Sequence, residues 1–230
     1  EMAHDIAVHI AFSKPKYLTN DEVPESEVEA ERETLTAITK AAPGVFSAAG
    51  HTFVNGDIVL LEVQGMVELN GRLLKVMGVA AGTFSVADVD GVTGIDTTLF
   101  NTFTSGTAKK VTLGTSITGV QDFTFAGGEI KTVDTTTVHD VVDTQIVVGA
   151  SAQSADMTMQ WDPAAAAQKA MIAAFQTRAN KGFKVLWPDG AYVLFYGTVG
   201  YTGAPGGGKQ GVTVSPAKIT MLGGLTIYSA

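Results

Sequence analysis

Residues 153–201 bring three local patterns into direct succession, and this order constrains the fold more than any other part of the sequence. Residues 156–161 alternate polar and apolar side chains, which predicts a β-strand with one buried face. Residues 163–180 are rich in alanine and predict a helix, and the Pro-Asp-Gly sequence at 188–190 predicts a tight hairpin turn. Small side chains on one helix face let the helix lie closely against a sheet. The residues assigned to that face are Ala166, Ala170, Ala173, Ala174 and Phe175.

From residue 36 onward, β-branched residues and glycine-containing turns dominate, which predicts a mainly β protein. The strands expected in the first part of this region lie at residues 37–40, 45–48, 58–63, 73–79, 83–86 and 108–112. Many short strands at this spacing favour a small β-barrel or sandwich. With 230 residues and 45% hydrophobic content, the chain can bury a sizeable core.

The first 35 residues differ from the rest in charge and in pattern. They hold nine acidic and three basic residues, so most of the net charge of -8 belongs to this segment. Ile6 and Ile10 are four residues apart, which predicts an amphipathic helix over residues 5–12. A second helix is expected to begin after Pro24 and to end at Leu35, with acidic residues in its first turns.

The composition excludes several kinds of site. The chain has no cysteine, so disulfides and thiolate-bound metal centres are impossible. His4 and His9 are five residues apart, which does not place two ligands on one helix face, and neither His51 nor His139 has a ligand partner nearby in sequence. The acidic residues Asp88, Asp90 and Asp96 lack the spacing of a calcium loop. We therefore expect no metal and no cofactor.

The glycine-rich residues 203–210 fit the spacing of a phosphate-binding loop up to Lys209. However, Gln210 stands where such a loop needs a serine or threonine, and the next residues predict a strand rather than a helix. The segment is better explained as a hairpin tip that contacts another subunit. We assign this contact to Gly206, Gly207, Lys209 and Gln210.

The longest apolar runs, such as residues 191–196, are far shorter than the roughly 20 residues of a membrane-spanning helix. We expect neither a membrane span nor secretion. Three apolar strands, at residues 146–148, 212–214 and 219–222, contain little charge or proline. Because charge and proline normally protect exposed sheet edges, these strands predict pairing between copies of the chain.

The succession over residues 114–230 resembles the tail tube proteins of long, flexible-tailed phages. It runs from residues 120–129 through a Thr- and Asp-rich stretch to the strand, helix and hairpin described above. Residues 37–112, with glycine turns at 55–57 and 70–71, are similar to a small β module of phage tail and baseplate proteins.

This resemblance implies a structural protein without enzymatic activity. Its copies would form hexameric rings that stack into a conduit, through which genomic DNA passes without sequence-specific binding. In the family, a long loop contacts the next ring, and this role falls on residues 127–146. The residues assigned to it are Asp134, Thr136, His139, Asp140 and Asp143. Other partners would be further phage tail proteins, and the location would be the virion after synthesis in the bacterial host cytoplasm.

Residues 3–35 resemble a piece of bacterial elongation factor Ts, and the amino-acid sequences of residues 3–24 and 31–35 carry this resemblance. The Thr-Asp-Phe-Val motif with which that family engages its GTPase is absent from the sequence. Nucleotide-exchange activity is therefore not expected, and the segment is interpreted as a helical appendage.

Together these patterns predict a short two-helix segment over residues 1–35, a small β-barrel-like module over 36–113 and a tail-tube β-sandwich with one packed α-helix over 114–230. We expect the lumen of the conduit to be neutral or weakly negative, because lysine and arginine contacts would retain DNA.

Two other functions stay open on sequence grounds. A carbohydrate- or surface-binding module would expose aromatic side chains around Phe53, Phe84, Phe100 and Phe103. A translation-factor-related binding protein would bind the elongation GTPase.

Overall fold

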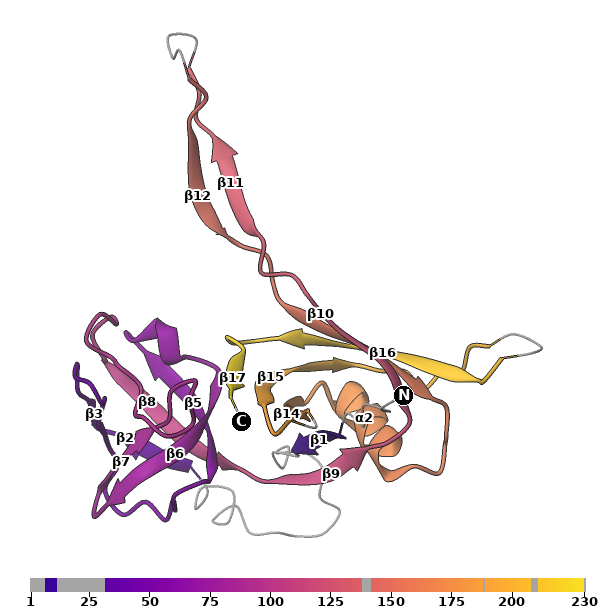
Figure 1. Ribbon diagram of the computed structural model, residues 1–230, viewed down its shortest axis with the longest axis horizontal. Helices are drawn as coiled ribbons and strands as arrows, with labels where there is room; N and C mark the ends of the chain where they lie inside the picture. Colours follow the sequence, from indigo (N-terminus) through magenta and orange to yellow (C-terminus); the bar gives the residue numbers. More distant parts are fainter. Residues whose placement is uncertain (1–6, 12–31, 138–141, 188, 208–210, 230) are drawn as a thin grey trace.

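The computed structural model describes residues 7–11, 32–137, 142–187, 189–207 and 211–229. Two curled β-sheets lie side by side, and a narrow two-stranded arm projects far from the second sheet (Figure 1). The described residues contain a single α-helix. The prediction of a mainly β fold with one packed helix is therefore confirmed.

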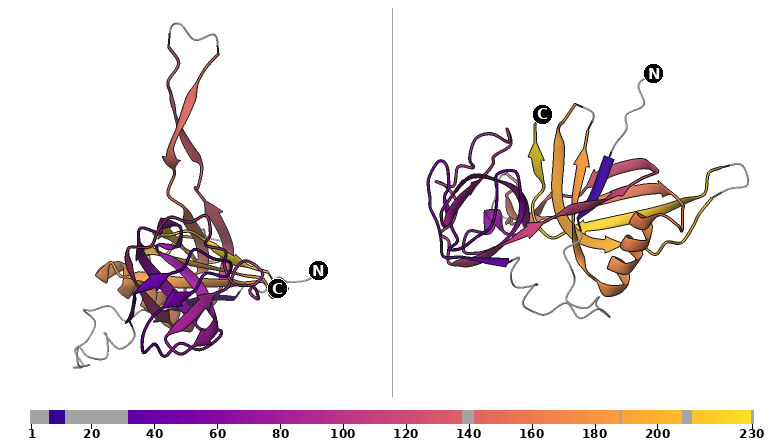
Figure 2. Two further views of the ribbon diagram at one scale, coloured as in Figure 1. Left: turned by 90° about the vertical axis from the view of Figure 1, so that its left-hand side faces the viewer. Right: turned by 90° about the horizontal axis from the view of Figure 1, so that it is seen from below.

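The first sheet is built from seven short strands. These are β2 (Arg32–Leu35), β3 (Ala37–Ile38), β4 (Phe46–Ser47), β5 (Ile58–Gln64), β6 (Arg72–Ala80), β7 (Thr83–Val86) and β8 (Ser105–Val111), with a 3-10 helix η1 (Val67–Leu69) after β5. Their order is β2-β8-β5-β6-β7-β4-β3. Only Thr36 separates β2 from β3, although they lie at opposite ends of the order, so the sheet has to curl until its ends meet (Figure 2). All six strands predicted between residues 37 and 112 are present.

The second sheet has eight strands. They are β1 (Ala7–Ala11), β9 (Leu113–Ile117), β10 (Val120–Ala126), β13 (Ser154–Gln160), β14 (Asn180–Leu186), β15 (Tyr192–Gly200), β16 (Val214–Met221) and β17 (Thr226–Tyr228). The order is β10-β13-β16-β15-β14-β1-β9, and β17 pairs with β15 beside this path. Two residues connect β9 to β10, which again lie at opposite ends, so this sheet curls as well.

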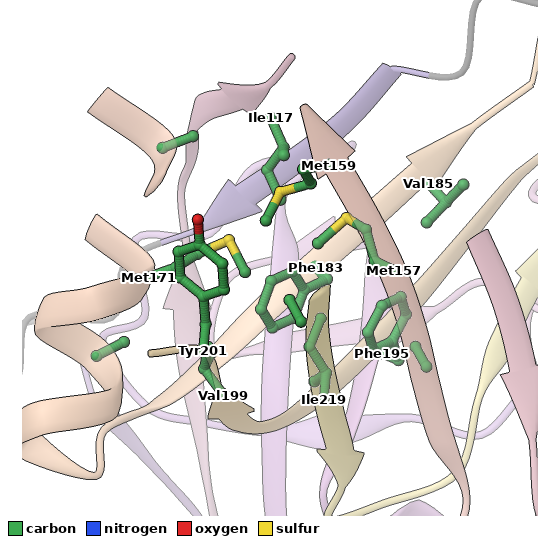
Figure 3. Close-up of a cluster of buried hydrophobic side chains, with 14 of the residues drawn as sticks. Ile117, Met157, Met159, Met171, Phe183, Val185, Phe195, Val199, Tyr201 and Ile219 are labelled. Carbon is green, nitrogen blue, oxygen red and sulfur yellow. The ribbon is translucent and has the colours of Figure 1, made fainter. Parts of the chain in front are cut away.

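Helix α2 (Ala166–Thr177) packs against the second sheet, as the alanine-rich pattern predicted. Its buried apolar residues are Ala167, Met171 and Ala174, which follow the i, i+4, i+7 spacing of one helix face. The predicted face was wrong in part, because Ala166 is exposed and the side chain of Phe175 is 42% exposed. Figure 3 shows Met171 beside Tyr201 in the cluster that also holds Met157, Met159 and Phe183.

Gln168 ties the helix to the sheet through a buried polar contact. Its side-chain amide donates to the carbonyl of Gln160 at 2.7 Å. Its side-chain oxygen accepts from the hydroxyl of Tyr201 at 2.9 Å and from the amide of Asp162 at 3.2 Å. The side chain is only 3% exposed, so these bonds form where water cannot replace them.

The helix predicted over residues 5–12 is wrong, because residues 7–11 form β1 between β14 and β9. Alternation of Val8 and Ile10 also fits a strand, and pairing on both sides satisfies the backbone more completely than one isolated helical turn. The second predicted helix is wrong at its end, since Arg32–Leu35 is strand β2, paired with β8. Residues 24–31 lie outside the described residues.

The expectation of free edges at residues 212–214 and 219–222 is also wrong for this sheet. Residues 214–221 form the single strand β16, which pairs with β13 on one side and β15 on the other. The edge positions belong instead to β10, which pairs only with β13 among the described strands, and to β9, which pairs only with β1.

The two sheets meet at a shared apolar cluster. Strand β8 continues into β9 after the single residue Thr112, and Leu60 and Leu73 of the first sheet pack with Leu194 of the second. The backbone at Gly223 approaches Gly71 so closely that a Cβ atom on Gly223 would lie 2.2 Å from the carbonyl oxygen of Gly71. A larger residue there would push the sheets apart.

Tyr228 of β17 completes this junction from the end of the chain. Its side chain is fully buried, and its hydroxyl accepts from the amide of Lys75 at 2.9 Å and donates to the carbonyl of Ala87 at 3.3 Å. Burial raises the pKa of Tyr228 to about 12. The un-ionised hydroxyl of Tyr228 therefore links β17 of the second sheet to β6 of the first sheet by a hydrogen bond.

Gln168→Ala should lower the free energy of unfolding by about 2–4 kcal/mol, because the buried Tyr201 hydroxyl, the Gln160 carbonyl and the Asp162 amide all lose their partner. Urea denaturation of the purified protein measures the change. Lys169→Ala, at the exposed neighbouring position, is the control and should stay within about 0.5 kcal/mol of the parent. A loss below about 1 kcal/mol for Gln168→Ala would contradict the anchoring role.

Tyr228→Phe should lower the free energy of unfolding by about 1–3 kcal/mol at neutral pH, because the amide of Lys75 loses its acceptor. The tyrosine of the unfolded chain ionises near its ordinary pKa of 10, whereas Tyr228 in the folded chain ionises near 12. The parent protein therefore loses stability as the pH rises from 10 to 12, and the gap to Tyr228→Phe should narrow over that range.

Urea titrations between pH 7 and 12 test this. Ile227→Val, at the half-exposed preceding position, should leave the pH profile unchanged. A gap that stays constant up to pH 12 would contradict the buried neutral phenol.

Candidate assembly surfaces

The arm consists of β11 (Ile130–Asp134) and β12 (Gln145–Ala150), which pair with each other and with no other described strand. Every residue of both strands is exposed (Figure 1). A two-stranded hairpin without a packed face is marginally stable in water. The described residues of the arm therefore gain little stability from packing against the rest of their own chain.

Each face of the arm carries large aliphatic side chains. Cross-strand pairing places Ile130, Thr132, Val147 and Asp134 on one side, which we call face A. Face B holds Val133 opposite Ile146, together with Lys131. The exposed fractions of these apolar side chains are 68% for Ile130, 61% for Val147, 50% for Val133 and 58% for Ile146. Since both faces are apolar, both faces have surface to bury.

The outer end of the arm is organised by threonine and aspartate, and several residues predicted to contact a neighbouring ring lie here. The carboxylate of Asp134 accepts from the amide of Thr136 at 2.8 Å and from its hydroxyl at 2.5 Å. These hydrogen bonds lower the pKa of Asp134, and the bond from the Thr136 hydroxyl is the larger cause. Asp143 is exposed, and His139 and Asp140 lie outside the described residues.

Aromatic rings anchor the base of the arm. Phe123 and Phe125 of β10 lie edge to face at 4.9 Å between ring centroids, and Phe125 contacts Phe195 of β15 at 5.6 Å. Gly127 follows with a φ of 89°, and a Cβ atom there would lie 2.1 Å from the carbonyl oxygen of Ala152. Only glycine permits this close approach, where the chain leaves the sheet for the arm.

The glycine-rich loop between β15 and β16 projects at the opposite end of the second sheet from the first sheet (Figure 1). Gly206 bridges to Val214, and Gly207 follows it. The indole nitrogen of Trp161 donates to the carbonyl of Gly203 at 3.1 Å, so this exposed tryptophan supports the loop. Lys209 and Gln210 lie outside the described residues. A strand rather than a helix follows the loop, as predicted.

The outer face of β10, β13 and β16 is polar. Thr124, Asp156 and Lys218 are neighbours across the three strands, and Asp122 and Thr158 form the next row with Pro216. The Lys218 ammonium lies 3.4 Å from the Asp156 carboxylate. These two rows contain two carboxylates and one cation, so the face is weakly acidic.

The aromatic platform expected for a carbohydrate-binding module is not formed. Phe53 and Phe84 are buried in the first sheet's core, where they stack around His51, and Phe100 and Phe103 pack against the same core. Among the described residues, no group of three or more His, Asp or Glu side chains could hold a metal ion. No helix in the described part of the chain is long and apolar enough to cross a membrane.

Sequence reasoning placed the arm at residues 127–146 and read it as a polar loop, whereas its strands run from residue 130 to residue 150. It predicted residues 146–148 as an exposed apolar strand but missed Ile130 and Val133 as surface residues. The signal was present as β-branched residues on both sides of a Thr- and Asp-rich turn. The edge position of β10 carried no such signal, because strand order is set by pairing far along the chain.

Comparisons with known proteins give two family matches. Residues 64–230 match the family described as "Phage tail tube protein, TTP". Residues 1–58 match the family described as "Elongation factor TS". No curated protein matches the chain.

Among solved structures, 13 chains match. One belongs to "Virion of native gene transfer agent (GTA) particle", with 18% identity and a TM-score of 0.38, and the match covers 52% of this chain and 89% of that chain.

Replacing Val133 and Ile146 together by threonine should change the free energy of unfolding of the isolated chain by less than about 1 kcal/mol, because both side chains are exposed. Val185→Thr, in the buried core, should cost more than about 2 kcal/mol and serves as the contrast. Urea denaturation of dilute protein measures both. A large loss for the arm variant would mean that the arm packs on its own body.

Proposed function

The chain belongs to the phage tail tube protein family, and we propose that its copies assemble into stacked rings that enclose a passage for DNA. Membership makes it a structural subunit of a phage tail, located in the virion. The rings would be hexameric, as the resemblance to the family implies. Synthesis in the bacterial host cytoplasm and contacts with other tail proteins belong to the same proposal.

The observation that carries the proposal is the edge strand β10. It is seven residues long and pairs only with β13 among the described strands. Its outer backbone groups are available to another strand, and long edge strands are templates for association. A strand from the neighbouring copy would complete the sheet, and repetition of a head-to-tail contact closes a ring.

The arm supplies the contact between rings in this proposal. It stands away from the sheet and exposes aliphatic side chains on both faces (Figure 1). Asp134, Thr136, His139, Asp140 and Asp143 would contact the next ring, with the described part of the contact formed by Asp134 and Thr136. The loop with Gly206, Gly207, Lys209 and Gln210 would contact a neighbour within the assembly.

The polar face of β10 and β13, up to the Asp156–Lys218 pair, suits the wall of the passage. Its exposed groups include the carboxylates of Asp122 and Asp156, and Lys218 is already paired with Asp156. A wall with few free cations gives DNA phosphates little to bind, so the genome can slide. The division into domains at residues 35 and 113 stays a prediction.

Electron microscopy of the purified protein tests the proposal, with size-exclusion chromatography as the companion measurement. We expect rings or tubes with a central channel. A protein that stays monomeric at high concentration, with no rings in the images, would refute ring assembly.

A variant in which residues 128–151 are replaced by a short glycine-serine turn separates the two kinds of contact. It should still form rings, because β10 is retained, but should not form long tubes, because the arm is missing. The parent protein at equal concentration is the control. Long tubes from the armless variant would assign stacking to another surface.

A further inference from the structure

An open groove lies where the end of α2 meets β15 and β16. Phe175, Gln176 and Arg178 line it from the helix end, and Val199 and Thr220 line it from the strands. Its volume is about 540 Å³. The 42% exposed ring of Phe175 makes part of the lining apolar. The groove can therefore accept an apolar side chain from outside the subunit.

Arg178 gives the groove an available positive charge. Three salt bridges form among the described residues, and none of them includes Arg178. Lys218 also lines the groove, but its ammonium is paired with Asp156. An exposed cation beside an exposed aromatic ring favours an occupant that carries a carboxylate next to an aliphatic group.

Face A of the arm has this combination. Asp134 lies on the same side as Val147, which pairs with Thr132 two residues before Asp134. The whole of residues 127–150 carries four acidic residues against the single Lys131, so the arm is acidic. Hydrogen bonds from Thr136 keep the pKa of Asp134 low, and the carboxylate is charged at neutral pH.

We propose that this groove is the receptor for face A of the arm of a second copy, with Val147 against Phe175 and Asp134 opposite Arg178. This inference rests on the proposed stacking of rings and names where on the neighbouring subunit the arm binds. The occupant is a copy of the same chain because the arm supplies both the apolar and the acidic group that the groove lacks.

The placement of the two pairs is compatible. Val147 and Asp134 are diagonal neighbours across the two strands of the arm, and such pairs lie roughly 7–8 Å apart on one face. Phe175 and Arg178 are three residues apart in sequence, and both line the groove. An aliphatic contact and a charge pair can therefore form at the same time.

Site-directed cross-linking tests the contact, and the absence of cysteine from the chain removes any background. Gln145 pairs with Asp134 on face A, and Gln176 lines the groove. The double variant Gln145→Cys with Gln176→Cys should give ladders of covalent multimers on non-reducing gels after mild oxidation. Lys131→Cys with Gln176→Cys places the first thiol on face B and is the matched control, which should cross-link at least tenfold less.

Charge exchange provides the second test. Arg178 has a left-handed backbone with a φ of 53°, which aspartate also tolerates, so Arg178→Asp keeps this backbone conformation accessible. Arg178→Asp and Asp134→Arg should each raise the protein concentration needed for tube formation by about tenfold. The double exchange should restore most of the parent value.

The outcomes separate this inference from the proposed function. If tubes form but the Gln145→Cys and Gln176→Cys thiols do not cross-link, the groove contact is overturned while ring assembly stands. The same holds if the double exchange shows the summed defects of the two single variants. If the parent protein forms no rings or tubes, the proposed function fails, and the groove contact fails with it.

Discussion

The shape of the whole subunit depends on one constraint, which is that strands adjacent in sequence lie at opposite ends of their sheet. Thr36 alone joins β2 to β3, and two residues join β9 to β10. Both sheets must curl, because such short links cannot cross a flat sheet. The outcome differs between them. The ends of the first sheet are strands of four and two residues, whereas β10 offers a seven-residue edge. Short edges discourage association, so the proposed assembly uses the second sheet.

The junction between the sheets fixes the sheet with short edges against the sheet with the long edge. Strand β8 runs into β9 with one intervening residue, and β17 returns from the end of the chain to bury Tyr228 beside Lys75 and Ala87. The close approach of Gly223 to Gly71 leaves no room for larger residues. One chain connection and two contacts between residues far apart in sequence therefore fix the first sheet against the second, on the side away from the glycine-rich loop (Figure 1).

Local sequence patterns predicted most strands and the helix, but they did not predict which strands lie next to each other in a sheet. The strands between residues 37 and 112 and the succession from β13 through α2 to β15 follow from alternation, alanine content and glycine turns. Residues 7–11 were misjudged because a five-residue apolar run fits a helix or a strand, and only pairing with β14 and β9 decides between them. Residues 212–222 looked like two edge strands, but they are largely one interior strand, since position in a sheet depends on partners distant in sequence.

In the proposed assembly, the edge of β10 and the arm make two different kinds of interaction. Pairing at β10 uses backbone hydrogen bonds, which every residue supplies and which depend little on side-chain identity. The arm depends on side chains, because its strands are already paired with each other and expose aliphatic groups and carboxylates instead. Backbone pairing is continuous with the sheet and favours a closed, repeated geometry. Side-chain docking at the end of a long arm selects one receptor among many surfaces, because it requires an apolar contact and a charge pair together. The separation allows a ring to form first and to be stacked by a contact whose specificity can change without altering the sheet.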